Sequence, residues 1–116
     1  MRLSDPGTVE AIAEVLAAEV RQAPFQLPLV SRRLGAGEEG EPVYQLSLDS
    51  QEAGGRLLIT LWPTLGRVDV RLGNHYWVLK GVEAVDLYPG VEVLFRRNQP
   101  PAFLFVSVKG RVALVA

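Results

Sequence analysis

The feature that most constrains the fold is a change of hydrophobic rhythm at Gln22–Pro24. After this point, short apolar runs alternate with turns that contain glycine, proline or asparagine, as expected for short strands. Before it, apolar residues recur three or four positions apart, at Val9, Ile12, Ala13, Leu16 and Val20. The pattern predicts one amphipathic helix followed by a largely β structure.

The start and the end of the helix carry recognisable signals. Asp5 can accept hydrogen bonds from the free amides of a first turn, and Pro6 has no amide to satisfy. Pro24 ends the helix because it disfavours helical backbone angles at Ala23. We therefore expect a helix over about residues 5–22, which lies on a sheet through its apolar face.

Strands are expected from about residue 25 to residue 115. The segments that show strand periodicity or apolar runs are Phe25–Leu29 (interrupted by Pro28), Val43–Leu48, Leu57–Trp62, Val68–Leu72, Tyr76–Lys80, Val82–Leu87, Val91–Phe95, Ala102–Val108 and Val112–Val115. Their connections are too short for parallel crossovers, which need a dozen or more residues. The sequence therefore predicts an α+β fold: one N-terminal helix, then a strongly bent, mostly antiparallel meander sheet or a partly closed barrel.

Composition narrows the class of protein. A chain of 116 residues with 48% hydrophobic content is expected to form one domain over residues 1–116. The absence of cysteine excludes a disulfide framework, a thiolate nucleophile and a cysteine zinc site. No apolar run reaches the roughly 18 residues of a membrane span and no signal peptide is recognisable, so we expect a cytoplasmic protein. The net charge of −1 disfavours nucleic acid as a partner.

The succession of strands and turns, with a glycine-bounded segment at Val82–Tyr88, resembles bacterial pleckstrin-homology-like domains. That resemblance implies a bent seven-stranded roll with a binding role. Those domains close one end with a C-terminal helix, whereas this sequence begins with the helix and ends in a strand. No specific motif is shared, and we do not assign the family.

Residues that could carry catalysis are few. His75 is the one histidine, beside the hairpin turn Gly73-Asn74, and a functional role would pair it with Asp69 or Asp86. The sequence contains no set of metal ligands, no Gly-x-Ser-x-Gly motif and no phosphate-binding loop. We predict no catalytic residue, cofactor or metal site; an enzyme that uses His75 is a minor alternative.

Three charged clusters receive no functional role from the sequence. The acidic run Glu38–Glu41 lies among glycines and is expected to be a solvated loop. The arginine doublets are Arg32, Arg33 and Arg96, Arg97. Neighbours on a strand point to opposite faces, so neither doublet forms a compact clamp within a strand.

The remaining anomaly is an excess of apolar surface. Ala102–Val108 and Val112–Ala116 are apolar on both strand faces, and one helix can cover only one patch of a sheet. Either the sheet closes around a core or a second subunit covers what remains. The leading prediction is a non-enzymatic interaction module that acts as a homodimer, with an interface at Phe103, Phe105, Leu114 and Val115. The alternative is a binder of small apolar ligands that uses a barrel interior.

Overall fold

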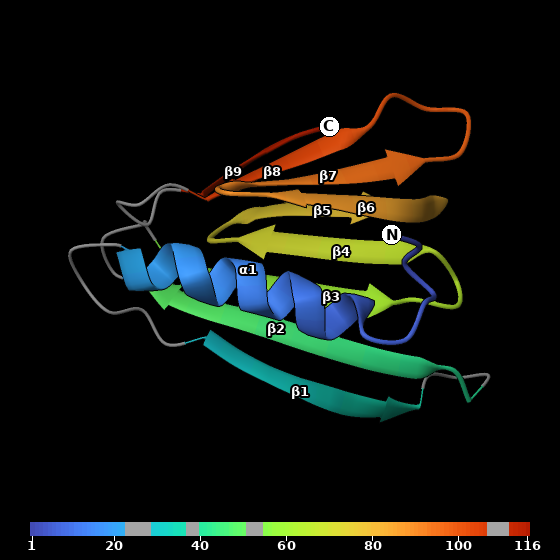
Figure 1. The fold of residues 1–116 in the computed structure, drawn as a ribbon, viewed down its shortest axis with the longest axis horizontal. Coiled ribbons are helices and arrows are strands. Elements are labelled where there is room, and N and C mark those ends of the chain that lie inside the picture. The colour runs from blue at the N-terminus through green and yellow to red at the C-terminus, as the bar shows by residue number, and fades with distance from the viewer. Residues whose placement is uncertain (23–28, 37–39, 51–54, 107–111) are drawn as a thin grey trace.

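The computed structural model describes residues 1–22, 29–36, 40–50, 55–106 and 112–116. Within these residues, helix α1 (Thr8–Gln22) precedes all the strands (Figure 1). The strands are β1 (Leu29–Ala36), β2 (Pro42–Ser50), β3 (Gly55–Trp62), β4 (Arg67–Leu72), β5 (His75–Leu79), β6 (Val82–Tyr88), β7 (Val91–Arg96), β8 (Ala102–Val106) and β9 (Val112–Val115). The architecture is mostly β, with antiparallel pairing between consecutive strands of each sheet, as predicted.

The strands form two sheets where the sequence suggested one bent sheet or a barrel. The first sheet has five strands in the order β1-β2-β3-β4-β5, and the second has four in the order β6-β7-β8-β9. The break falls at Gly81, whose φ is 69°. The Val82 amide donates to the Gly66 carbonyl and the Arg97 amide donates to the Gly81 carbonyl, both at 2.8 Å. These two hydrogen bonds link the turns at Gly66, Gly81 and Arg97, and so join the two sheets at one end. Neither sheet closes on itself.

Helix α1 begins later than Asp5. Gly7 has a φ of 86°, outside the helical range, and its carbonyl accepts the Ala11 amide at 2.9 Å. The Thr8 hydroxyl donates to the carbonyl of Arg2 at 2.8 Å. The Asp5 carboxylate accepts the amide of Arg2 at 3.4 Å and is not the helix cap.

Strand β1 was only partly anticipated. The expected strand Phe25–Leu29 falls mostly on residues 23–28, which lie outside the described part of the chain. β1 instead runs from Leu29 to Ala36 and pairs with β2, with an irregularity between Arg33 and Gly35. Two adjacent arginines and a bulge hide the alternation by which a strand is recognised in sequence.

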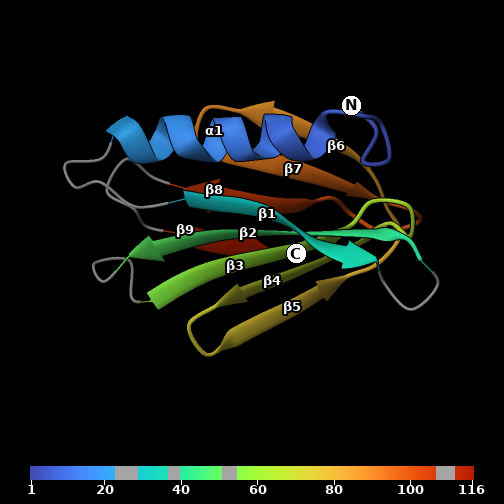
Figure 2. The same ribbon diagram turned by 90° about the horizontal axis from the view of Figure 1, so that it is seen from below.

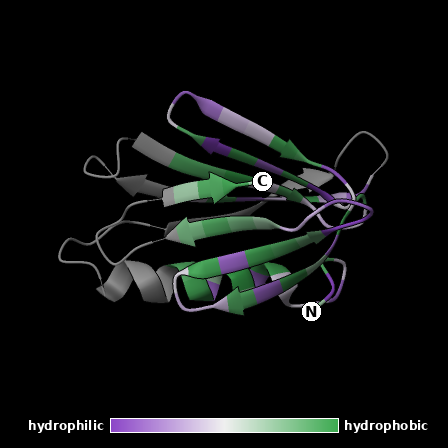
Figure 3. Ribbon diagram, turned by 90° about the horizontal axis from the view of Figure 1, so that it is seen from above, coloured by the Kyte–Doolittle hydropathy of each residue, from purple (hydrophilic) through white to green (hydrophobic). Residues whose placement is uncertain are grey.

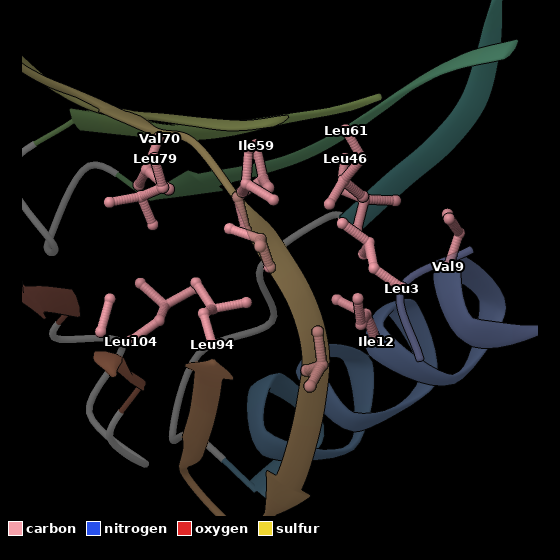
Figure 4. Close-up of a cluster of buried hydrophobic side chains, with 14 of the residues drawn as sticks. Leu3, Val9, Ile12, Leu46, Ile59, Leu61, Val70, Leu79, Leu94 and Leu104 are labelled. Carbon is pink, nitrogen blue, oxygen red and sulfur yellow. The ribbon is translucent and has the colours of Figure 1, made fainter. Parts of the chain in front are cut away.

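Helix α1 and both sheets contribute to one hydrophobic core (Figure 4). Leu94 and Leu104 of the second sheet point toward Val70 and Leu79 of the first, and Ile12 extends from the helix into the same space. Among the buried residues of the helix stripe are Val9, Ile12 and Leu16; the side chain of Val20 lies outside the described part. The helix therefore covers the open side between β1 and β6, as Figure 2 shows.

The segment Met1–Leu3 pairs with the edge of β6. The Leu3 amide donates to the Glu83 carbonyl at 3.0 Å, and the Val85 amide donates to the Met1 carbonyl at 2.8 Å. The Leu3 side chain is buried in the core. This pairing covers one edge of the second sheet, so that β9 forms its other edge.

Candidate functional site

The register of the second sheet sorts its residues onto two faces. Phe103 is paired with Val93 on one side and Val115 on the other, and Phe105 is paired with Val91 and Ala113. Residues two apart on a strand share a face. We call this surface the apolar face; it consists of Ala84, Asp86, Tyr88, Val91, Val93, Phe95, Phe103, Phe105, Ala113 and Val115.

Large side chains of the apolar face are open to solvent. The exposed fraction is 38% for Phe95, 39% for Phe105, 54% for Tyr88 and 57% for Val115. The rings of Phe103 and Phe105 stack with their centroids 6.2 Å apart. Asp86 is the one charged residue among those that make up the face. Figure 3 shows the predominance of hydrophobic residues on the strands near the C-terminus.

Three of the four predicted interface residues lie together on the apolar face: Phe103, Phe105 and Val115. Leu114 lies on the opposite face, where it is paired with Leu104 and packs against the core. The alternation of side chains along β9 separates Leu114 from its neighbours. The sequence showed that this strand is apolar on both faces, but the register was needed to tell which face is covered.

Glu92 is a buried charged residue that the sequence did not single out. It lies in the inward row of the second sheet between Leu87 and Leu104, with 3% of its surface exposed. Its Oε1 atom has no hydrogen-bond partner. Burial raises the pKa of Glu92 to about 8, since an apolar environment disfavours the charged form. Val91, Val93 and Phe95 alternate with Glu92 along β7, so periodicity alone would place Glu92 on the exposed face of the strand.

Asp69 is buried as well, but its carboxylate is satisfied. It lies on the outer side of the first sheet, where it accepts hydrogen bonds from Arg67 Nε at 2.8 Å, Arg67 Nη2 at 2.9 Å and the Tyr76 hydroxyl at 2.6 Å. The hydrogen bond to Asp69 raises the pKa of both Arg67 and Tyr76. The Arg67 guanidinium also lies 4.7 Å from the Trp62 ring centroid.

Among the described residues, His75 contacts Trp77, and the two predicted carboxylate partners bind other residues. Its ring stacks on Trp77 with a centroid distance of 5.7 Å, while Asp69 is bound to Arg67 and Tyr76. Asp86 lies on the second sheet, where the Tyr88 hydroxyl is 3.5 Å from its carboxylate. In the described parts of the chain, no three histidine or acidic side chains come together as a set that could hold a metal ion.

The charged clusters have local partners where the structure describes them. Arg96 donates from Nε and Nη2 to the Pro100 carbonyl at 3.0 and 2.7 Å, and Arg97 pairs with Glu83 at 2.8 Å. Arg32 and Arg33 lie on β1, and their side chains are outside the described part. Of the acidic run Glu38–Glu41, residues 38 and 39 are likewise outside it.

The search for membrane-spanning helices and the comparisons with known proteins give no further indication of function. The only helix among the described residues, α1, is not long and apolar enough to cross a bilayer. The chain matches none of the known family models, and none of the curated proteins or solved structures resembles it significantly.

Proposed function

We propose that the protein is a non-enzymatic interaction module that forms a homodimer through the apolar face of its second sheet. The observation that carries this proposal is the exposure of Tyr88, Phe95 and Phe105 on a face where Asp86 is the one charged residue among the described strand residues. Arg2, which is bridged to Ala84, lies at the edge of this face. Contiguous apolar surface of this kind marks interaction sites in water-soluble proteins.

The composition of the apolar face suits a protein interface. Aromatic side chains are enriched and charged side chains depleted at the centre of such interfaces, where aromatic residues supply much of the binding free energy. Phe103, Phe105 and Val93 form the middle of the face, while Asp86 lies on β6 at its side. A two-fold dimer brings the same patch of both subunits together, so one apolar face can cover another.

The dimensions of the face set the expected strength of association. Four strands at a spacing of about 4.8 Å make a surface roughly 15–20 Å wide. The strands are four to seven residues long, so at about 3.4 Å per residue the face is roughly 15–25 Å long and covers roughly 250–450 Å². This area is smaller than the roughly 800 Å² per partner of a standard stable interface. We therefore expect a reversible dimer with a dissociation constant in the micromolar range.

The alternative, a cavity for small apolar ligands, finds less support in the packing. The space between the two sheets contains bulky side chains, among them Ile59, Leu79, Leu94 and Leu104. An enzyme that uses His75 would need a partner for its imidazole, and the ring stacks on Trp77 instead. The self-association of the apolar face is the proposal that the described surface favours.

The mass of the protein in solution, measured by light scattering and sedimentation between about 1 and 500 μM, tests the proposal. We expect the wild type to approach the mass of two chains, and Phe105→Glu to remain at the mass of one. Val78→Glu is the matched control, because Val78 is an exposed strand residue (40%) on the first sheet. A single-chain mass for the wild type at the highest concentration, or dimerisation of Phe105→Glu like the wild type, contradicts the proposal.

A further inference from the structure

A hollow of about 220 Å³ lies on the outer side of the first sheet, away from the apolar face. It is lined by Leu58, Thr60, Asp69, Arg71 and Tyr76. Leu58, Arg71 and Tyr76 are direct neighbours in the register of β3, β4 and β5, and Thr60 is paired with Asp69 in the adjacent row. Its volume is below the roughly 300–1,000 Å³ of pockets for drug-sized molecules, so its ligand would be small.

Arg71 is the available charged group in this hollow. Its guanidinium carbon lies 5.6 Å from the centroid of the Tyr76 ring, and no carboxylate of the described residues forms an ion pair with it. The Tyr76 hydroxyl is bound to Asp69, which holds the ring beneath the guanidinium. A guanidinium held on an aromatic ring keeps its N–H donors free in a plane, the geometry that a carboxylate matches with two parallel hydrogen bonds.

Asp69 selects for the charge of the ligand. Arg67 neutralises its carboxylate through two hydrogen bonds, and these bonds with the one from Tyr76 occupy both carboxylate oxygens. Within the cluster of Arg67, Asp69 and Arg71, one positive charge is left uncompensated. A singly charged anion balances it, whereas a dianion would leave an excess negative charge in the hollow.

From this arrangement we propose that the hollow binds a small monocarboxylate. Arg71 holds the carboxylate group through its guanidinium, and Thr60, which lines the hollow, supplies a hydroxyl as a further hydrogen-bond donor. The apolar body of the ligand lies against Leu58 and the edge of Tyr76. This site is independent of the dimer proposed above, because it lies on the other sheet.

Titration of the full chain with benzoate, followed by amide chemical shifts in NMR spectra, tests the site. We expect saturable shifts centred on Leu58, Thr60, Arg71 and Tyr76, with a dissociation constant of millimolar order. Arg71→Gln should weaken binding by roughly tenfold or more, the usual effect of losing a charge-assisted hydrogen bond. Arg71→Lys retains the charge without the planar fork and should bind between the two.

Arg97→Gln is the matched control, since Arg97 is an exposed arginine that follows β7 of the second sheet and pairs with Glu83. It should bind benzoate like the wild type. Inorganic phosphate, titrated over the same range, should give weaker shifts at the hollow. The proposal is overturned if benzoate shifts do not saturate or centre elsewhere, if phosphate binds more tightly, or if a folded Arg71→Gln binds benzoate as the wild type does.

Discussion

Glu92 lies directly opposite Leu104 in the pairing of β7 with β8, so a carboxyl group occupies a row that the neighbouring strands fill with leucine. Leu87 is its partner on the other side, in β6. The side chain is buried and its Oε1 atom has no hydrogen-bond partner. A buried carboxyl without a partner is held in its neutral form, and folding must take up a proton where the unfolded chain would release one.

The stability of the protein should therefore fall as the pH rises. The pKa of Glu92 is about 8 in the folded protein and about 4.5 when exposed, so the folded state binds more protons between these values. The contribution of Glu92 makes the free energy of unfolding highest below about pH 4.5. Between pH 4.5 and pH 7 the free energy of unfolding decreases by about 3 kcal/mol, and it levels off above pH 8. Chemical denaturation at pH 5, 7 and 9 measures this decrease.

Variants separate the contribution of Glu92 from that of other groups. Glu92→Leu removes the carboxyl and should raise the free energy of unfolding at pH 9 by more than about 3 kcal/mol. It should also flatten the profile between pH 5 and 9. Glu14→Gln, which changes an exposed glutamate on α1, should keep the wild-type profile. An unchanged profile in Glu92→Leu would show that another group controls the pH dependence.

The helix should be integral to the fold. Leu16 is 2% exposed and belongs to the core that both sheets share. We expect Leu16→Asp to lower the free energy of unfolding by at least about 3 kcal/mol, because it places an unpaired charge in an apolar contact. Thermal and urea denaturation provide the measurement. A cooperative, wild-type-like melt of a chain that lacks residues 1–22 would contradict this role.

The turn at Gly66 should not tolerate a side chain. Gly66 has a φ of 66°, and an added Cβ would lie 2.8 Å from the Val82 carbonyl oxygen. We expect Gly66→Ala to destabilise the protein by about 2 kcal/mol or more, from backbone strain together with this close contact. Gly40→Ala is the control: φ is 83° there but nothing lies within 4 Å, so only the strain of about 1 kcal/mol applies. Equal melting temperatures for the two variants would contradict the steric argument.

His75 should be dispensable. Its side chain is exposed and its principal contact is the stack on Trp77. His75→Ala should lower the free energy of unfolding by less than about 1 kcal/mol, the scale of an exposed aromatic pair, and leave dimerisation unchanged. Differential scanning calorimetry and light scattering test both points. Loss of self-association in a folded His75→Ala would assign the residue a role that its position does not suggest.

Local patterns were sufficient for the elements that alternate clearly. Val68 and Val70, which alternate with charged residues in the sequence, lie buried on β4, and Gly73-Asn74 connects β4 to β5 as a hairpin. These local patterns did not predict which residues pair with one another across neighbouring strands. Asp69 points away from the core, yet it is buried because Arg67 and Tyr76 close over it.

The sequence by itself determined the order of a helix and antiparallel strands, because hydrophobic periodicity and turn residues act over short distances along the chain. Tertiary structure alone decided the division into two sheets, the pairing of Met1–Leu3 with β6, and the separation of Leu114 from Phe105 onto opposite faces. It also decided the burial of Glu92. These features depend on which strands meet and in what register, and such long-range pairing leaves no local signature in the residues that form it.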